Sequence, residues 1–138
     1  MDASDITVVL VDGNVLFRTG LRELLERNGI TVVGEARSVE AGLLLVERRQ
    51  PDVVVVDPEA PGCPDDDGRE AIRRIKAGSP ATHVLALACA AGDQEAVDIV
   101  CMGGSCFLLK DAPPETILAG VRAAAAGESL IAPRVAAS

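Results

Sequence analysis

Three short apolar segments of this chain each end on one charged residue. The segments and the residues that follow them are 8–11 with Asp12, 53–56 with Asp57, and 107–109 with Lys110. Apolar runs of this length, rich in Val and Leu, are typical of strands buried on both faces of a parallel sheet. Side by side, three such strands would bring two carboxylates and an ammonium together at their carboxyl ends. Open α/β sheets place their ligand sites at that edge, so we expect a site there.

Length and composition indicate one globular domain. The chain has 138 residues, of which 49% are hydrophobic and 25% are charged. That is enough to bury a single sizeable core, and too apolar for a disordered chain. No apolar stretch is long enough to cross a bilayer, and the first residues do not resemble a signal peptide. We therefore expect a cytoplasmic protein with no membrane partner.

The charge and the cysteines exclude two further classes of function. With a net charge of −8, no Trp, no Tyr and no dense basic cluster, the chain is not expected to bind nucleic acid itself. The cysteines form no C-x-x-C pair, and His83 is the only histidine, so a zinc site is not expected. The cysteines, which we interpret as small buried hydrophobes, are Cys63, Cys89, Cys101 and Cys106.

Strand-like and helix-like patterns alternate five times along the chain. The expected strands are 6–11, 31–34, 53–57, 83–88 and 105–109. The expected helices are 15–27, 39–50 with Ser38 as N-cap, 69–78, 93–102, and a last one from about 113 to a stop at Gly127. This alternation predicts a flavodoxin-like (βα)5 fold, a doubly wound parallel sheet with strand order 2-1-3-4-5.

Several motifs along the chain resemble those of one family. They are Leu-Val-Asp-Gly-Asn at 10–14, Pro-Asp-Val-Val-Val-Val-Asp at 51–57, Pro-Gly at 61–62, Phe-Leu-Leu-Lys-Asp-Ala-Pro-Pro-Glu at 107–115, and Ala-Gly-Glu-Ser-Leu at 126–130. From Ile6 to about Pro133, the chain is similar to the receiver domain of a two-component response regulator of the NarL/FixJ type. The resemblance implies a receiver domain over residues 1–127. It also implies a linker over 128–138, leading toward a helix-turn-helix DNA-binding domain outside this chain.

The resemblance implies a role for each matching residue. Asp57 corresponds to the aspartate that accepts a phosphoryl group from a histidine kinase, and Lys110 to the lysine that pairs with that group. Asp12 corresponds to the first of two acids that hold a magnesium ion, and the backbone carbonyl of Glu59 to a further ligand of that ion. Phe107 corresponds to the aromatic switch residue.

Two residues depart from the family pattern at this site. Gly13 stands where the second acid would contact the metal directly, and Ala88 stands where a switch Ser or Thr would bind the phosphoryl oxygens. Phosphoryl transfer depends on positioning and on neutralising charge, and Mg²⁺ needs several oxygen ligands. We therefore expect no cofactor or only weakly bound Mg²⁺, and control largely independent of Asp57 phosphorylation. The module would be regulatory rather than an enzyme.

Other interpretations remain open at this stage. The chain could be a conventional receiver in which Asp12, Asp57 and waters hold Mg²⁺ weakly, or a module that binds a small ligand in the neutralised pocket. Asp65–Asp67 could supply the missing acid, and Cys89, expected at the rim of the site, could have a sensing role. The expected partners are a histidine kinase, a second copy of the chain, and DNA only through the separate C-terminal domain.

Overall fold

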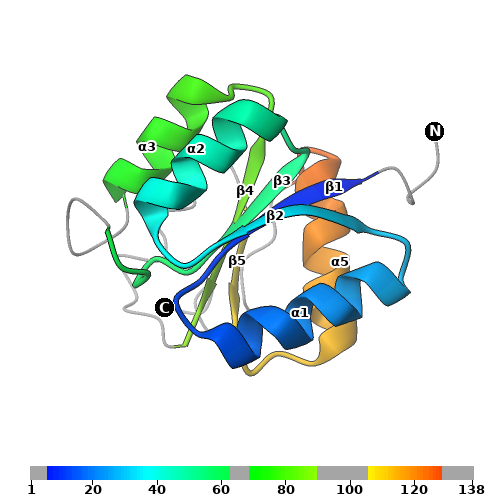
Figure 1. The fold of residues 1–138 in the computed structure, drawn as a ribbon. Helices are drawn as coiled ribbons and strands as arrows, with labels where there is room; N and C mark the ends of the chain where they lie inside the picture. The colour runs from blue at the N-terminus through cyan, green and yellow to red at the C-terminus, as the bar shows by residue number, and fades with distance from the viewer. Residues whose placement is uncertain (1–5, 63–68, 90–105, 129–138) are drawn as a thin grey trace, which may run out of the picture.

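A parallel sheet forms the centre of the molecule (Figure 1). The computed structural model describes residues 6–62, 69–89 and 106–128. Within these residues the strands lie in the order β2-β1-β3-β4-β5, which confirms the predicted order. The strands are β1 (Thr7–Val11), β2 (Thr31–Ala36), β3 (Val53–Val56), β4 (His83–Ala88) and β5 (Cys106–Leu109).

Helices cover both faces of this sheet. The described helices are α1 (Val15–Arg27), α2 (Val39–Arg49), α3 (Arg69–Gly78) and α5 (Pro114–Ala125). Helices α1 and α5 lie on one face, and α2 and α3 lie on the other (Figure 1). The predicted N-cap is confirmed, because the Ser38 side chain accepts a hydrogen bond from the Ala41 backbone N–H. None of the described helices is both long and apolar enough to span a membrane.

The observed boundaries differ from the predicted ones at a few strand ends. Strand β2 continues two residues further than expected, because Glu35 and Ala36 pair with Leu10 and Val11 of β1. Strand β3 ends at Val56, one residue earlier than expected, although the Asp57 N–H still donates to the Val11 carbonyl at 2.9 Å. The predicted helix at 93–102 lies outside the described residues, as does Ser105, the expected start of the last strand.

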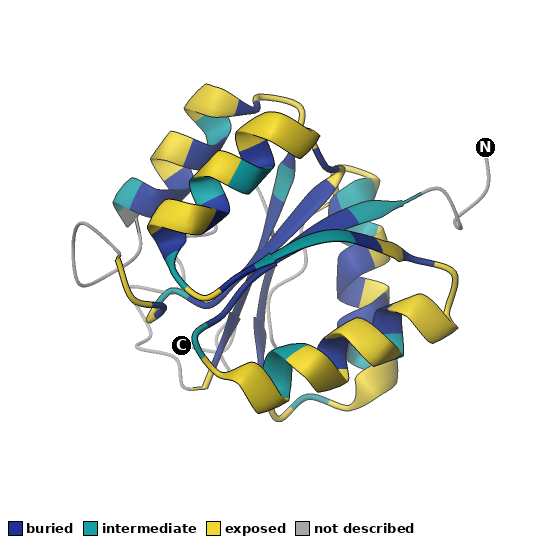
Figure 2. Ribbon diagram, in the orientation of Figure 1, coloured by how far each residue is buried: buried dark blue, intermediate teal, exposed yellow. Residues whose placement is uncertain are grey.

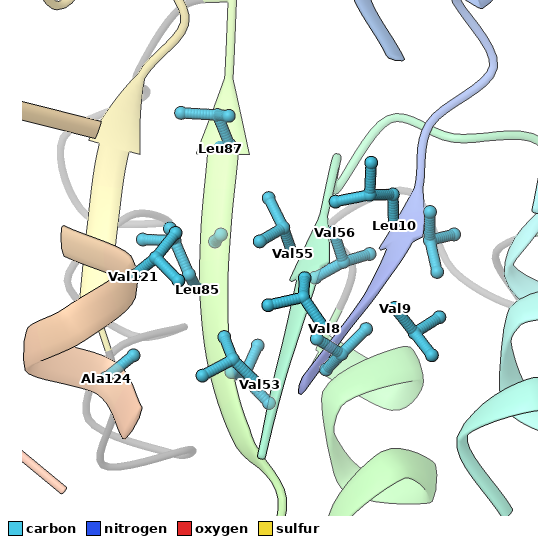
Figure 3. Close-up of a cluster of buried hydrophobic side chains, with 14 of the residues drawn as sticks. Val8, Val9, Leu10, Val53, Val55, Val56, Leu85, Leu87, Val121 and Ala124 are labelled. Carbon is cyan, nitrogen blue, oxygen red and sulfur yellow. The ribbon is translucent and has the colours of Figure 1, made fainter. Parts of the chain in front are cut away.

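Apolar side chains of the central strands fill both interfaces between the sheet and its helices (Figure 3). The four valines of β3 are at most 3% exposed, as a strand covered on both faces requires. Most exposed residues lie on the outer faces of the helices and in the loops (Figure 2), and Thr31 at the start of β2 is also exposed. In α1, Leu21 and Leu25 are buried in the core, and Leu24 is partly buried. This core fixes the strand ends at which the charged residues lie.

Candidate functional site

Asp12, Asp57 and Lys110 meet at the carboxyl edge of the sheet, as the sequence predicts. The Lys110 ammonium Nζ lies 2.7 Å from Asp12 Oδ2 and 2.9 Å from Asp57 Oδ2. The three side chains are only 9–11% exposed. One cation therefore bridges two largely buried carboxylates, and the cluster keeps one net negative charge.

Lys110 follows a strand that is not adjacent to the strands of Asp12 and Asp57, as the predicted strand order implies. Strands β1 and β3 are neighbours, but β4 lies between β3 and β5. The Lys110 backbone N–H donates to the Ala88 carbonyl at 2.8 Å, so its main chain is held at the end of β4. Its long side chain then spans the width of that strand to reach Asp57. The ion pairs form because a lysine side chain is long enough to span this gap.

Backbone groups occupy the remaining carboxylate oxygens. The Asn14 N–H donates to Asp12 Oδ1 at 2.8 Å, and the Glu59 N–H donates to Asp57 Oδ1 at 2.8 Å. Both bonds join an aspartate to the residue two positions later, a local turn that Asp favours after a strand. Each carboxylate thus accepts one backbone hydrogen bond and one from the ammonium, so all four oxygens have partners within the protein.

The environment of Lys110 favours its charged form. Burial lowers the pKa of Lys110, but the hydrogen bonds and charges of Asp12 and Asp57 together outweigh this effect, and the net pKa is raised. The ring of Phe17 adds to this stabilisation, because its centroid lies 4.5 Å from Lys110 Nζ, within the range of a cation–π contact. The sequence pattern did not predict this contact between Phe17 and Lys110.

Arg18 is a second residue that sequence analysis did not identify. Its guanidinium donates to the backbone carbonyl of Asp12 and, from Nε at 3.0 Å, to Glu35 Oε1. Glu35 lies at the end of β2, so this pairing depends on the register between β1 and β2 and on the packing of α1. Arg18 therefore holds the main chain at Asp12 from the α1 side.

The other candidate residues lie in the loops after β1 and β3 and in strands β4 and β5. Gly13 packs close to Pro61, since a Cβ built on Gly13 would lie 3.0 Å from Pro61 Cδ. Ala88 and Phe107 are buried in β4 and β5, at 4% and 2% exposure, and Glu59 is exposed. The structure thus places these residues without testing the roles that the family resemblance implies for them.

Two of the four cysteines lie in the described part of the chain. The interpretation of Cys89 as a small buried hydrophobe is wrong, because Cys89 is exposed where it follows Ala88 at the carboxyl end of β4. Cys106 is buried, and its Sγ lies 3.4 Å from the Glu128 carbonyl. Cys63, Cys101 and Asp65–Asp67 lie outside the described residues.

The described residues fit a tightly held magnesium ion poorly. Mg²⁺ prefers near-octahedral coordination by oxygen. Asp12 and Asp57 supply carboxylates, but the Lys110 ammonium already contacts both, and Gly13 supplies no side-chain oxygen. Within the described ranges, no three His, Cys, Asp or Glu side chains form a group that could hold a metal. The donor set has the right chemistry for a hard cation, but too few free ligands.

Comparison with known proteins gives a consistent picture. Residues 8–122 match the family described as the response regulator receiver domain. The nitrate/nitrite response regulator protein NarL of Escherichia coli K12 is 32% identical over 126 residues, which cover 91% of this chain and 57% of NarL. The response regulator GacA of Pseudomonas protegens is 33% identical, over 95% of this chain and 61% of GacA. This chain therefore spans about three fifths of the length of these curated relatives.

Solved structures show the same relationship. The crystal structure of a LuxR-family two-component response regulator from Aurantimonas sp. is 31% identical, with a TM-score of 0.85 over 95% of this chain and 92% of that one. A Burkholderia pseudomallei response regulator, solved with a phosphorylated aspartic acid, a calcium ion and citrate, is 28% identical. Its TM-score is 0.75, over 88% of this chain and 69% of that one.

Proposed function

The chain belongs to the response regulator receiver domain family, and we propose that its output is controlled largely independently of Asp57 phosphorylation. It is a receiver domain of the NarL/LuxR type, a class whose members are transcriptional regulators rather than enzymes. The proposal therefore concerns how this receiver is switched, and not which family it belongs to.

The cation bridge at the carboxyl edge is the observation that carries this proposal. Lys110 contacts Asp12 and Asp57 at once, and the backbone N–H groups of Asn14 and Glu59 satisfy the other two oxygens. To accept a phosphoryl group, Asp57 must exchange these partners for a metal and for the incoming phosphorus. Charge on the transferred group would then be neutralised mainly by one ammonium, because Gly13 adds no further anion to hold a metal.

Ala88 supports the same proposal, because it affects how the domain would respond to a phosphoryl group on Asp57. Its methyl group cannot donate a hydrogen bond to a phosphoryl oxygen. A phosphoryl group on Asp57 would therefore lack the contact by which a hydroxyl at this position would draw the end of β4 toward the site. Together, Gly13 and Ala88 weaken both the formation of a phosphorylated state and its effect on the rest of the domain.

The remaining parts of the proposal concern partners and context. We place residues 1–127 in the receiver and residues 128–138 in a linker toward a C-terminal helix-turn-helix domain, through which alone the regulator would contact DNA. We expect a cytoplasmic homodimer. A histidine kinase is the expected upstream partner, but its phosphorylation of Asp57 would contribute little to control. The match to NarL and GacA, which are longer than this chain, supports this arrangement.

Intact-mass spectrometry after incubation with acetyl phosphate and Mg²⁺ tests the central proposal. We expect the wild-type chain to stay mostly unmodified, and a Gly13→Asp, Ala88→Thr double variant to gain a phosphoryl adduct. Adding Asp57→Asn to the double variant is the matched control for the modified residue, and should abolish the adduct. A stoichiometric adduct on the wild-type chain would refute the proposal.

A conventional phospho-accepting receiver with weak Mg²⁺ is the second candidate function. The 2.9 Å contact between Lys110 and Asp57 favours it, because the lysine is already placed to pair with a group on that carboxylate. The phosphorylated aspartic acid of the Burkholderia pseudomallei relative also favours it. A magnesium titration followed by NMR separates the candidates, since saturable shifts near Asp12 and Asp57 at millimolar metal are expected only for the conventional receiver.

A further inference from the structure

A largely buried arginine contacts the turn that carries Asp12. The Arg18 side chain is only 11% exposed, and its guanidinium donates to acceptors in two different strands or their ends. One acceptor is the backbone carbonyl of Asp12, directly after β1. The other is Glu35 Oε1 on β2, which lies 3.0 Å from Arg18 Nε. A guanidinium presents its N–H donors in a rigid fork, so the two bonds together fix it relative to both strands.

The Asp12 main chain is therefore bonded on both sides. Its N–H donates to the Ala36 carbonyl of β2 at 3.0 Å, and its carbonyl accepts from Arg18. That carbonyl belongs to the peptide group between Asp12 and Gly13, and glycine has the widest backbone freedom of any residue. A peptide group next to a glycine needs an outside restraint if the preceding side chain is to keep one orientation. Arg18 supplies this restraint.

A second arginine orients Glu35. The Oε1 atom of Glu35 accepts from Arg18, and its Oε2 accepts from Arg22, one turn further along α1. The α1 pair of Arg27 with Glu23 is 73% and 63% exposed, and exposed pairs of this kind contribute little to stability. The Arg18–Glu35 pair is 11% and 23% exposed, so it also loses hydration. Since that loss offsets much of its Coulomb energy, the pair is better explained by the positions that it imposes than by stability.

The first turn of α1 reaches the lysine of the site by a second route. Phe17 precedes Arg18 in this turn, and its ring centroid lies 4.5 Å from Lys110 Nζ. The Asn14 side chain caps the turn by accepting from the Phe17 N–H at 3.0 Å. The Asn14 N–H in turn donates to Asp12 Oδ1. A movement of this turn would therefore alter the contacts of Lys110 with both Asp12 and Phe17.

We propose that Arg18 and Glu35 form a positioning pair for the charged cluster at the carboxyl edge. The charged cluster consists of Asp12, Asp57 and Lys110. Arg18 fixes the peptide group after Asp12, and so the orientation in which Asp12 Oδ2 meets the Lys110 ammonium at 2.7 Å. Glu35 acts one step further away, by orienting Arg18. This role goes beyond the proposed function, because it does not depend on whether Asp57 is phosphorylated.

Exchange of the Lys110 ammonium protons with water, measured by NMR at low temperature, tests the proposal. The ammonium is 10% exposed and bonded to two carboxylates, so its exchange rate reports how firmly the aspartates hold it. The chain has one other lysine, Lys76, whose Nζ donates to the Thr82 carbonyl at 2.8 Å. Lys76 is the reference within the same molecule, because opening of the whole domain would speed up exchange at both lysines.

We expect Arg18→Gln to speed up Lys110 exchange by about 10-fold, the size expected when a hydrogen bond to a charged group is lost. Lys76 exchange should not change. Arg18→Lys should behave like Arg18→Gln, because it keeps the charge but loses the fork. Glu35→Ala should act in the same direction, and the double variant Arg18→Gln, Glu35→Ala should be no faster than Arg18→Gln, because both residues act by one route.

Arg22→Gln is the matched control. It removes an arginine from the same helix and a hydrogen bond from the same glutamate, but it leaves both bonds of Arg18 in place. Lys110 exchange should therefore stay within about 2-fold of the wild-type rate. Circular dichroism checks that each variant is folded. Should Arg18→Gln not fold, the comparison of Glu35→Ala with Arg22→Gln decides the test.

Four results would overturn the assignment. Wild-type exchange at Lys110 in Arg18→Gln would leave the pair with no influence on the cluster. Equal acceleration at Lys76 would assign the effect to opening of the whole domain. Wild-type exchange in Arg18→Lys, or an Arg22→Gln variant as fast as Arg18→Gln, would assign it to charge and not to the fork. These measurements use no phosphodonor and no Mg²⁺, so this proposal and the mass-spectrometric test of Asp57 can fail separately.

Discussion

The two edges of the sheet bury polar groups in different ways. At the carboxyl edge, the buried groups are charged, with Lys110 between Asp12 and Asp57. At the amino edge they are neutral, and Ser79 and Thr82 are both 0% exposed. Both edges have every buried side-chain polar atom satisfied within the described residues, but they reach this state by different chemistry.

Hydroxyl groups link two loops at the amino edge. Ser79 Oγ lies 2.6 Å from Thr82 Oγ1 and 3.0 Å from Gln50 Oε1, while Thr82 Oγ1 donates to the Pro51 carbonyl at 2.7 Å. These bonds join the segment after α2 to the segment after α3. Because every group is neutral, burial costs little once the hydrogen bonds form.

At the charged edge, the free energy gained from the ion pairs is offset by the cost of burying the charges. Ion pairs with little exposure gain Coulomb energy but lose hydration, and the two terms are of similar size. Removing or adding one charge there leaves a buried charge without compensation. Removing one hydroxyl at the amino edge only breaks the hydrogen bonds of that hydroxyl. The difference indicates that the carboxyl edge is more sensitive than the amino edge to a change in charge.

Replacing Lys110 by Met should produce the largest effect and sharpen this contrast. The substitution keeps much of the side-chain length but leaves two buried carboxylates facing each other without a cation. We expect a loss of about 3 kcal/mol in the free energy of unfolding at neutral pH. Urea denaturation measures it.

The charge-free triple variant Asp12→Asn, Asp57→Asn, Lys110→Met is the control for this effect. It removes all three charges at once, and should recover most of the lost stability. If the triple variant is as unstable as Lys110→Met alone, packing and not charge balance holds this edge together.

Thr82→Val should have a smaller effect at the amino edge. Valine keeps the shape of threonine but leaves the Pro51 carbonyl without its donor, so we expect a loss of about 1–2 kcal/mol. Thr19→Val is the matched control, because Thr19 is exposed on α1, and it should change stability by less than about 0.5 kcal/mol. A loss at Thr82 as large as that at Lys110 would erase the distinction between the two edges.

Sequence reasoning recovered the charged edge better than the neutral one. Asp12, Asp57 and Lys110 each follow an apolar strand, so the strand pattern alone brings them to one edge. Ser79 and Thr82 flank a turn, and nothing in a Ser-Pro-Ala-Thr segment tells a buried hydroxyl from an exposed one. Their burial depends on how the loops after α2 and α3 meet, which is a tertiary contact.

The contacts that α1 makes with the charged cluster could not be predicted either, because they also depend on tertiary packing. A helical period assigns Phe17 to the inner face, but it cannot say that the ring covers an ammonium from the far end of the chain. Arg18 donates both to the Asp12 carbonyl and to Glu35, which lies near the end of β2 and is far from Arg18 in sequence. Pattern recognition finds the strands and their ends, whereas side-chain pairings between distant elements require the coordinates.

Gly13→Asp should reveal how sensitive the charged edge is to an added anion. A third carboxylate beside Asp12 and Asp57 should lower stability by about 1 kcal/mol in the presence of EDTA. Pro61 must also shift by a few tenths of an ångström to admit the new Cβ, which would lie 3.0 Å from Pro61 Cδ. Millimolar Mg²⁺ should restore the stability of this variant, because ligand binding to the folded state stabilises it.

Thermal melts with and without Mg²⁺ measure this effect, with the wild type as the control. The variant should respond to the metal and the wild type should respond much less. An equal rise in Tm for both proteins would show that Gly13 does not limit metal binding.

The smallest effect on stability is expected from a rise to alkaline pH, which allows a direct comparison of the two edges. The chain has two lysines, and they lie at opposite edges: Lys110 bridges two carboxylates, and Lys76 Nζ donates to the Thr82 carbonyl at 2.8 Å. The pKa of Lys110 is raised in the folded state, so the unfolded chain loses that proton first as pH rises. The stability supplied by Lys110 is therefore complete below its unfolded pKa of about 10.4 and is lost progressively above it.

In urea denaturation series, the free energy of unfolding of the wild type and of Lys76→Met should fall alike as pH rises through this range. That of Lys110→Met should fall less, because its ion pairs are already missing. The chain has no Tyr, and its cysteines are the same in all three proteins, so other titrations cancel in the comparison. Parallel curves for all three proteins would mean that the ammonium of Lys110 contributes no more at its edge than that of Lys76 does at the other.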